Sequence, residues 1–213
     1  MPRERIYTKA GDDGTTGLFY GGRVAKDSEL PTAYGTVDEA QAVLGLARAG
    51  AGPGELADLL VELMRDLYVL MAELATAPAN RHKLTPGSSA VTQPMVDALE
   101  AHIDALDALF DPPTEFVVPG GNAVAAWLDL GRTVVRRAER AALVAAPPPS
   151  LVVPYLNRLS DLLFILSRHA NREAGDVLWV PGGTPDAARP STAGGSDAEH
   201  RAALDADGDD ATG

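Results

Sequence analysis

A segment near the N-terminus, YTKAGDDGTTG at residues 7–17, has the residue types of an anion-binding loop. Its glycines would let backbone N–H groups approach a phosphate, its threonines add hydroxyl donors, and Lys9 adds a positive charge. The same letters are also typical of a surface turn. The segment does not follow the GxxxxGK[ST] pattern and no apolar strand precedes it, so a Walker-type loop is not indicated.

Two later segments carry polar side chains at helical spacing. The first set is Arg132, Arg136, Glu139 and Arg140, and the second is Asn157, Asp161, Arg168 and Arg172 with Phe164 between them. Such stripes either face solvent or line a polar cleft shared by two helices, because burying them without partners would be costly. The helix with the first set follows the letters PGGN, so its N-terminal amides could meet an anion. Together with the loop, the stripes suggest a polyanionic ligand.

Several kinds of chemistry are excluded or disfavoured by composition. The 213 residues include no cysteine, which excludes disulfides, thiolate metal sites and a cysteine nucleophile. No HxxxH motif or carboxylate–histidine pair is present, so we expect no catalytic metal held by protein ligands. His169, beside Arg168, is expected to be structural or on the surface. The formal charge of −12 argues against a general nucleic-acid binder.

Apolar periodicity predicts an all-α bundle with a single core. Thr36 and Glu39 form a capping-box pattern, which predicts a shorter helix over 36–49. Four longer helices are predicted within 55–77, 92–110, 123–146 and 151–175, and no segment shows convincing strand alternation. The buried stripe of the fourth helix is expected to be Trp127, Leu130, Val134, Ala138 and Ala141.

The chain divides into a body and an acidic tail. Residues 1–181 form the predicted helical domain. Residues 182–213 carry seven acids against two arginines and almost no large apolar side chains, so we expect this tail to be disordered. The opening residues have no apolar signal segment, and no apolar run approaches the roughly 20 residues of a membrane span, so we expect a cytoplasmic protein.

Six motifs in order give the body a specific resemblance. They are YTKAGDDGTTG, GGRVAKDS, AYGTVDEA, FVVPGGN, RTVVRRAER and YLNRLSDLLF. In this combination the chain resembles the PduO-type ATP:cob(I)alamin adenosyltransferases. The resemblance implies a five-helix bundle, four helices long and one shorter, that assembles as a homotrimer with active sites between subunits. It also implies transfer of the 5′-deoxyadenosyl group from ATP to the cobalt of cob(I)alamin, with Mg²⁺ as helper ion and adenosylcobalamin and triphosphate as products.

The resemblance assigns roles residue by residue. The loop over the ATP phosphates would comprise Thr8, Lys9, Gly11, Asp12, Gly14 and Thr16, followed by the basic residue Lys26. We expect it to order only when ATP binds. Nucleotide contacts from the helices would be Arg132, Arg136, Arg137, Glu139 and Asn157. Asp38 matches an acid that pairs with Arg132 across the subunit boundary, and Phe116 matches an aromatic residue that displaces the lower axial ligand of cobalt. Arg137 points about 100° away from Arg136 along the helix, so a surface role or a contact to a neighbouring subunit also stays open for it.

The sequence departs from the family pattern at three places. Asp129 stands where a histidine is usual, Gly131 where alanine is common, and DEAQ replaces Asp-Glu-Leu-Asn. Two other functions are compatible with such a chain: a non-catalytic ATP-sensing bundle that regulates or delivers to a cobalamin enzyme, and a helical scaffold with a solvated charge stripe. For a transferase we expect a cobalamin reductase and an adenosylcobalamin-dependent mutase as possible partners.

Overall fold

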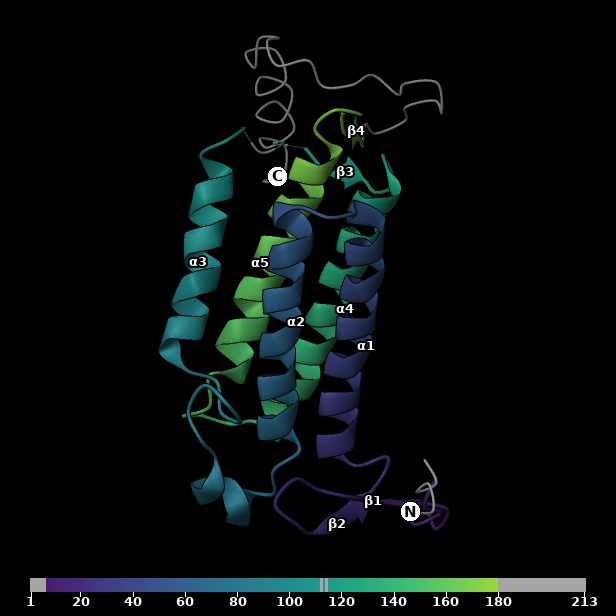
Figure 1. Ribbon diagram of the computed structural model, residues 1–213, viewed down its shortest axis with the longest axis vertical. Coiled ribbons are helices and arrows are strands. Elements are labelled where there is room, and N and C mark those ends of the chain that lie inside the picture. Colours follow the sequence, from purple (N-terminus) through teal and green to yellow (C-terminus); the bar gives the residue numbers. More distant parts are fainter. Residues whose placement is uncertain (1–6, 112, 114, 180–213) are drawn as a thin grey trace, which may run out of the picture.

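The computed structural model describes residues 7–111, 113 and 115–179, and five α-helices dominate it (Figure 1). They are α1 (Glu29–Ala51), α2 (Glu55–Leu74), α3 (Gln93–Asp107), α4 (Ala123–Ala145) and α5 (Val152–Asn171). The predicted all-α bundle is confirmed. A short 3₁₀ helix, η1 (Pro78–Lys83), lies in the connection between α2 and α3 and was not predicted.

One hydrophobic core holds the bundle together. α1 packs against α2 and α4, while α5 packs against α4 and α3. Fully buried leucines from α1, α2, α4 and α5 fill the interior, among them Leu44, Leu67, Leu128 and Leu163. The buried Tyr155 also belongs to this core, and its hydroxyl donates a hydrogen bond to Asp66 on α2 at 3.0 Å. The helices around this core form the rigid frame for the polar faces of α4 and α5.

The predicted start and length of the first helix are wrong. α1 begins at Glu29, seven residues before the Thr36–Glu39 pattern, and with 23 residues it is as long as α4. The Thr36 hydroxyl donates to the Thr32 carbonyl within the helix, so it caps nothing. Pro31 is tolerated because it lies in the first turn, where a missing N–H costs no helical hydrogen bond. The shortest of the five α-helices in the described part of the chain is α3, with 15 residues.

The predicted buried stripe of α4 is also partly wrong. Trp127 is 37% exposed and Leu130 is 43% exposed, whereas Val134 and Ala138 are buried as expected. The buried face instead runs through Leu128, Gly131, Val135, Ala138, Ala142 and Ala145. A Cβ added at Gly131 would lie 3.3 Å from a Leu44 methyl, which shows how closely α1 approaches α4. Small residues give a weak hydrophobic signal but permit this close helix packing.

Four short strands were not predicted either. β1 (Thr15–Gly17) and β2 (Arg23–Ala25) form an antiparallel hairpin beside the start of α1. β3 (Val117–Val118) pairs antiparallel with β4 (Val177–Leu178) at the opposite end of the bundle. Each strand has only two or three residues, too few for a recognisable alternation of apolar and polar side chains.

No helix within the described residues is long and apolar enough to cross a membrane. The whole of the predicted tail at 182–213 and its boundary at residue 181 lie outside the part of the chain that the structure describes.

Candidate active site

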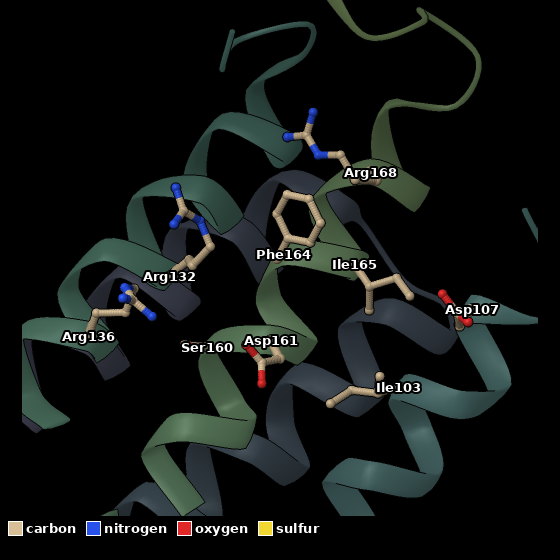
Figure 2. A pocket seen from close by; sticks show the side chains of 9 residues that line it. All are labelled: Ile103, Asp107, Arg132, Arg136, Ser160, Asp161, Phe164, Ile165 and Arg168. Carbon is tan, nitrogen blue, oxygen red and sulfur yellow. The ribbon is translucent and has the colours of Figure 1, made fainter. Parts of the chain in front are cut away.

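Two adjoining cavities open along α4 and α5. The α3-side cavity, of about 340 Å³, is lined by Ile103, Asp107, Arg132, Arg136, Ser160, Asp161, Phe164, Ile165 and Arg168 (Figure 2). The β3-side cavity, of about 440 Å³, is lined by Pro113, Glu115, Phe116, Val117, Pro119, Asp129, Arg132, Phe164 and Arg168. Both volumes fall within the range of small-molecule sites. Half of each polar stripe therefore lines these shared clefts, namely Arg132 and Arg136 of α4 and Asp161 and Arg168 of α5. The other members, Glu139, Arg140, Asn157 and Arg172, line neither cavity.

Three side chains lie on the boundary between the cavities, because Arg132, Phe164 and Arg168 line both. In Figure 2 the Phe164 ring lies between Arg132, which comes from α4, and Ile165, which points toward α3. The Arg168 guanidinium lies 5.8 Å from the centroid of the Phe164 ring, within cation–π range. The Phe164 ring offers an apolar surface, and Arg132 and Arg168 beside it offer positive charge. This combination suits a ligand that has both an anionic group and a planar apolar group.

The two arginines on this boundary are held differently. Arg168 is buried, and its guanidinium forms ion pairs with Asp129 on α4 and with Asp176 just before β4. Arg132 is half-buried, and its Nε lies 3.7 Å from the Asp129 carboxylate without making a hydrogen bond. Arg168 thus has its charge satisfied within the protein, whereas Arg132 still has donors to offer.

The other predicted contacts of α4 separate into two groups. Arg136 is exposed and lines the α3-side cavity with Arg132. Glu139 is joined to α5 by a hydrogen bond from the Asn157 amide at 3.1 Å, so these two predicted residues do meet. Arg137 lines neither cavity and forms an ion pair with Glu39 of α1.

Phe116 lies at the β3 end of the bundle and is 80% exposed. Its backbone carbonyl accepts a hydrogen bond from the Trp179 N–H at 2.7 Å, next to the β3–β4 pairing. A role for Phe116 as an ordinary core residue is therefore excluded. An exposed ring at the wall of a cavity suits a contact with an apolar ligand.

The start of α4 is less open to an anion than we expected. Asn122 caps the helix, since its Oδ1 accepts a hydrogen bond from the Ala125 N–H at 2.9 Å. Its Nδ2 donates to the Ala170 carbonyl and to the Asn171 side chain of α5. A Cβ at Gly121 would overlap the Asn171 amide. In the PGGN segment, Gly121 and Asn122 thus allow the start of α4 to pack closely against the end of α5.

The N-terminal segment 7–28 forms a hydrogen-bonded turn and hairpin. The Arg23 side chain donates to the Ala10 carbonyl and to Thr15, and it lies 3.6 Å from Asp13. Hydrogen bonds from the backbone and hydroxyl of Thr15 hold the pKa of the Asp13 carboxyl below its usual value. Gly11 leaves the space that the Lys26 side chain fills, since a Cβ there would lie 2.9 Å from Lys26 Nζ.

The five other predicted loop residues lie in the same turn and hairpin. Lys9 and Gly14 have positive φ angles of 58° and 81°. Thr8, Lys9, Asp12 and Gly14 are exposed, and Thr16 is half-buried in β1. The turn therefore presents two lysines, Lys9 and Lys26, on an exposed glycine-rich backbone, as a phosphate-binding loop requires.

Within one chain this loop lies far from the β3 end, where Phe116 is found (Figure 1). Its hydrogen bonds to the later part of the described chain run to the end of α2, to η1 and to the connection before α3. They join Phe19 to Ala75, Asn80 to Tyr20 and Gly21, and the Tyr20 hydroxyl to Ser89. Asp38 is exposed on α1, and the ion pair recorded for Arg132 is with Asp129. One chain alone therefore does not bring the loop and the cavities together.

Some residues of the site carried no signal in the sequence. Ile103 and Asp107 line the α3-side cavity from α3, and Asp176 holds Arg168 from a segment that follows the last helix. Their positions depend on how distant helices pack, which no local spacing reports. No group of three or more His, Cys, Asp or Glu side chains among the described residues is placed to hold a metal ion. His169 is half-buried near Phe110, and burial and then Arg172 lower its pKa.

Comparisons with known proteins agree on one family. The family model described as cobalamin adenosyltransferase matches residues 6–170. A corrinoid adenosyltransferase of Mycobacterium tuberculosis (strain CDC 1551 / Oshkosh) is 48% identical over 185 residues, which cover 84% of this chain and 94% of the relative. A corrinoid adenosyltransferase of Citrobacter freundii is 41% identical over 167 residues, covering 77% and 93%.

A solved structure shares the fold. It is a variant of a PduO-type ATP:corrinoid adenosyltransferase from Lactobacillus reuteri complexed with cobalamin and ATP, with a TM-score of 0.72 and 29% sequence identity over 82% of this chain and 96% of that one. With the family model spanning most of the helical body, the chain belongs to the cobalamin adenosyltransferase family.

Proposed function

We propose that this chain transfers the 5′-deoxyadenosyl group of ATP to the cobalt of cob(I)alamin, giving adenosylcobalamin and triphosphate. Its family and its corrinoid adenosyltransferase relatives support this activity, and the similar solved protein binds both cobalamin and ATP. The observation that carries the proposal is the arrangement of the two cavities. Arginines line the α3-side cavity, an exposed aromatic ring lines the β3-side cavity, and Arg132 belongs to both.

The nucleotide would bind along the cationic side of this site. Arg132 and Arg136 on α4 would contact the triphosphate, with Glu139 and Asn157 beyond them toward the start of α5. Lys9 and Lys26, with the backbone of the glycine-rich turn, would cover the phosphates. Backbone N–H groups and cations arranged before the reaction stabilise charge that develops on a leaving group.

The corrin would bind on the β3 side, against Phe116. Reduction of Co(II) to Co(I) becomes easier when the lower axial ligand is removed, and the exposed Phe116 ring would displace that ligand. Phe164 would add a second apolar contact on the wall that the two cavities share.

The chemistry requires no nucleophile from the protein. In the transfer, Co(I) supplies the electron pair of the new Co–C bond, and the C5′–O bond of ATP breaks with its electrons passing to triphosphate. The chain contributes orientation and electrostatics, because the hard chemistry belongs to the cofactor. Arg132, Arg136, Lys9 and Lys26 would offset the negative charge that grows on the leaving triphosphate.

We propose that Mg²⁺ enters with ATP. Mg²⁺ is commonly held by substrate phosphates and one or two carboxylates rather than by an all-protein cage. The exposed Asp12 in the turn is the carboxylate among the predicted loop residues that such a complex could use. The ion would add positive charge beside the triphosphate.

We also propose that the active enzyme is a homotrimer with its sites between subunits. The loop and the β3 end are far apart within one chain, so a loop from a neighbouring subunit would complete each cleft. In such an assembly Asp38 of one subunit would pair with Arg132 of the next. Exposed apolar side chains on α4, such as Trp127 and Leu130, would then be covered. A cytoplasmic location, a cobalamin reductase and a mutase that receives the product belong to the same proposal.

A visible spectrum under anaerobic conditions tests the activity. Purified protein at catalytic concentration is mixed with chemically reduced cob(I)alamin, Mg²⁺ and ATP. The account predicts loss of the cob(I)alamin band and growth of a light-sensitive adenosylcobalamin spectrum. An unchanged spectrum from protein that binds ATP would instead support the ATP-sensing bundle, although such a sensor has no need of an exposed Phe116.

A further inference from the structure

The strongest unassigned feature of the site is a buried cluster of charges behind it. We define the clamp as Asp129 on α4, Arg168 on α5 and Asp176 before β4. Arg168 is buried and donates to both carboxylates, and its Nε lies 3.2 Å from the Ser167 hydroxyl. Asp176 also accepts a hydrogen bond from Asn171 at 2.7 Å. Every charged group of the clamp therefore has partners inside the protein.

The clamp carries an excess negative charge that faces Arg132. Two carboxylates and one guanidinium leave a net charge of −1, and Arg132 supplies the balancing positive charge. The Nε of Arg132 is buried, makes no hydrogen bond and lies 3.7 Å from Asp129. A shift of about 1 Å would bring this pair to hydrogen-bond distance. Contact through Nε leaves the two terminal nitrogens of Arg132 to serve the triphosphate and Asp38 of the neighbouring subunit.

We infer that Asp129 is a positioning residue for the adenosyl transfer: it aims the Arg132 guanidinium at the leaving triphosphate, and Arg168 and Asp176 hold Asp129 in place. This inference rests on the proposed function. An arginine on a flexible side chain spreads over many rotamers, and fixing one edge restricts the rest. Such preorganisation increases the rate when the charge to be stabilised appears only in the transition state.

The clamp also connects Arg132 to the Phe116 end of the site. Asn171, which donates to Asp176, accepts a hydrogen bond from Asn122 at the start of α4. The residues after Asp176 form β4, which pairs with β3 directly after Phe116. The segment that carries Phe116 and the Asp129 side chain that contacts Arg132 are thus both held by the Arg168–Asp176 ion pair.

A double-mutant cycle tests this role. Asp129→Asn keeps the size of the side chain but removes its charge, and Arg132→Lys keeps the charge but removes the Nε–H. In wild-type background we expect Asp129→Asn to lower kcat by about tenfold to a hundredfold, the range for a misplaced catalytic group, with little change in KM for ATP. In the Arg132→Lys background the same substitution should change kcat by a factor of about two or less.

Two outcomes would overturn the inference. One is an equal loss of kcat from Asp129→Asn in both backgrounds, which is the behaviour of a merely structural carboxylate. The other is unchanged kcat in a folded Asp129→Asn protein. Asp104→Asn, at an exposed carboxylate of α3 that lines neither cavity, is the matched control and should leave kcat unchanged. If Asp129→Asn does not fold, the same cycle is run with Asp176→Asn. An inactive wild type would refute the proposed function instead, because both single variants are read against it.

Discussion

Arg132 is the residue on which the two halves of the site depend, because its side chain lines both cavities. The buried carboxylate beside it and the exposed Phe116 at the far wall give the site an electrostatic side and an apolar side. The sequence identified Arg132, Arg136 and Phe116 because they lie in motifs. It could not identify the Asp129–Arg168 contact, since this joins residues 39 positions apart on two different helices.

At Phe116 we predict that substitution by alanine separates the two halves of the reaction. Phe116→Ala should weaken formation of four-coordinate Co(II) more than it weakens ATP binding, because the lost ring faces only the β3-side cavity. Low-temperature absorption or magnetic circular dichroism of bound Co(II) measures the first effect and ATP titration the second. Equal losses in both would count against the wedge role.

At the level of elements, the helices were predictable and their exact edges were not. Leu-rich periodicity predicted α2 and α5. In contrast, Thr36 and Glu39 match a capping-box pattern but lie inside α1, so the predicted start of that helix was wrong. Trp127 looked like a core residue because its spacing matches the apolar periodicity of α4, yet it is 37% exposed in the chain. β3 and β4 are two residues each, and their pairing joins segments about 60 residues apart, beyond any local pattern.

For the N-terminal turn we predict ordering by the nucleotide. The segment 7–17 is mostly exposed and has few contacts with the core, so its amides should exchange hydrogen quickly in the free protein. ATP with Mg²⁺ should slow exchange in 7–17. The control region is η1, at the same end of the bundle, where exchange should not change. Equal protection in both regions would indicate a general stabilisation rather than a phosphate-binding loop.

For the α4–α5 junction we predict a loss of stability on removal of the cap. Asn122→Ala removes the acceptor of the Ala125 N–H, which costs about 0.5–2 kcal/mol in free energy of unfolding. Asn122→Asp keeps that acceptor and loses only the donor to the Ala170 carbonyl and the Asn171 side chain, so it should cost less than Asn122→Ala, which loses all three hydrogen bonds. Urea unfolding of the three proteins measures both effects. If the aspartate variant were as unstable as the alanine variant, the capping hydrogen bond would not be the source.

At the level of the whole molecule, stability should respond to the Asp66–Tyr155 contact. Burial raises the pKa of Asp66, and the nearby Glu62 raises it further against the lowering effect of the Tyr155 hydrogen bond. A raised carboxyl pKa means that the folded state holds the proton more tightly, so stability from this group falls as pH rises above about 3.8. Asp66→Asn should therefore melt higher than wild type at pH 7, with the difference shrinking at pH 3. A difference that did not change with pH would exclude a titration effect.

The proposed trimer would bring together what one chain holds apart. Within one chain the N-terminal hairpin lies beside the start of α1, whereas β3, which follows Phe116 directly, lies at the opposite end of the bundle (Figure 1). In the proposed trimer each active site takes its loop from one subunit and its α4–α5 cleft from another. In a closed ring of three subunits, each subunit would supply both halves to different neighbours.

Mixed subunits test that claim most directly. One variant combines Lys9→Ala with Lys26→Ala in the loop, and the other is Arg132→Ala in the cleft. After co-refolding, any trimer that contains both variants has one interface in three with an intact loop and an intact cleft, so adenosylcobalamin formation should recover to roughly one-third of wild type per mixed trimer. Activity that stays at the mean of the two separate variants, in a mixture shown to contain both chains in one oligomer, would contradict a site shared between subunits.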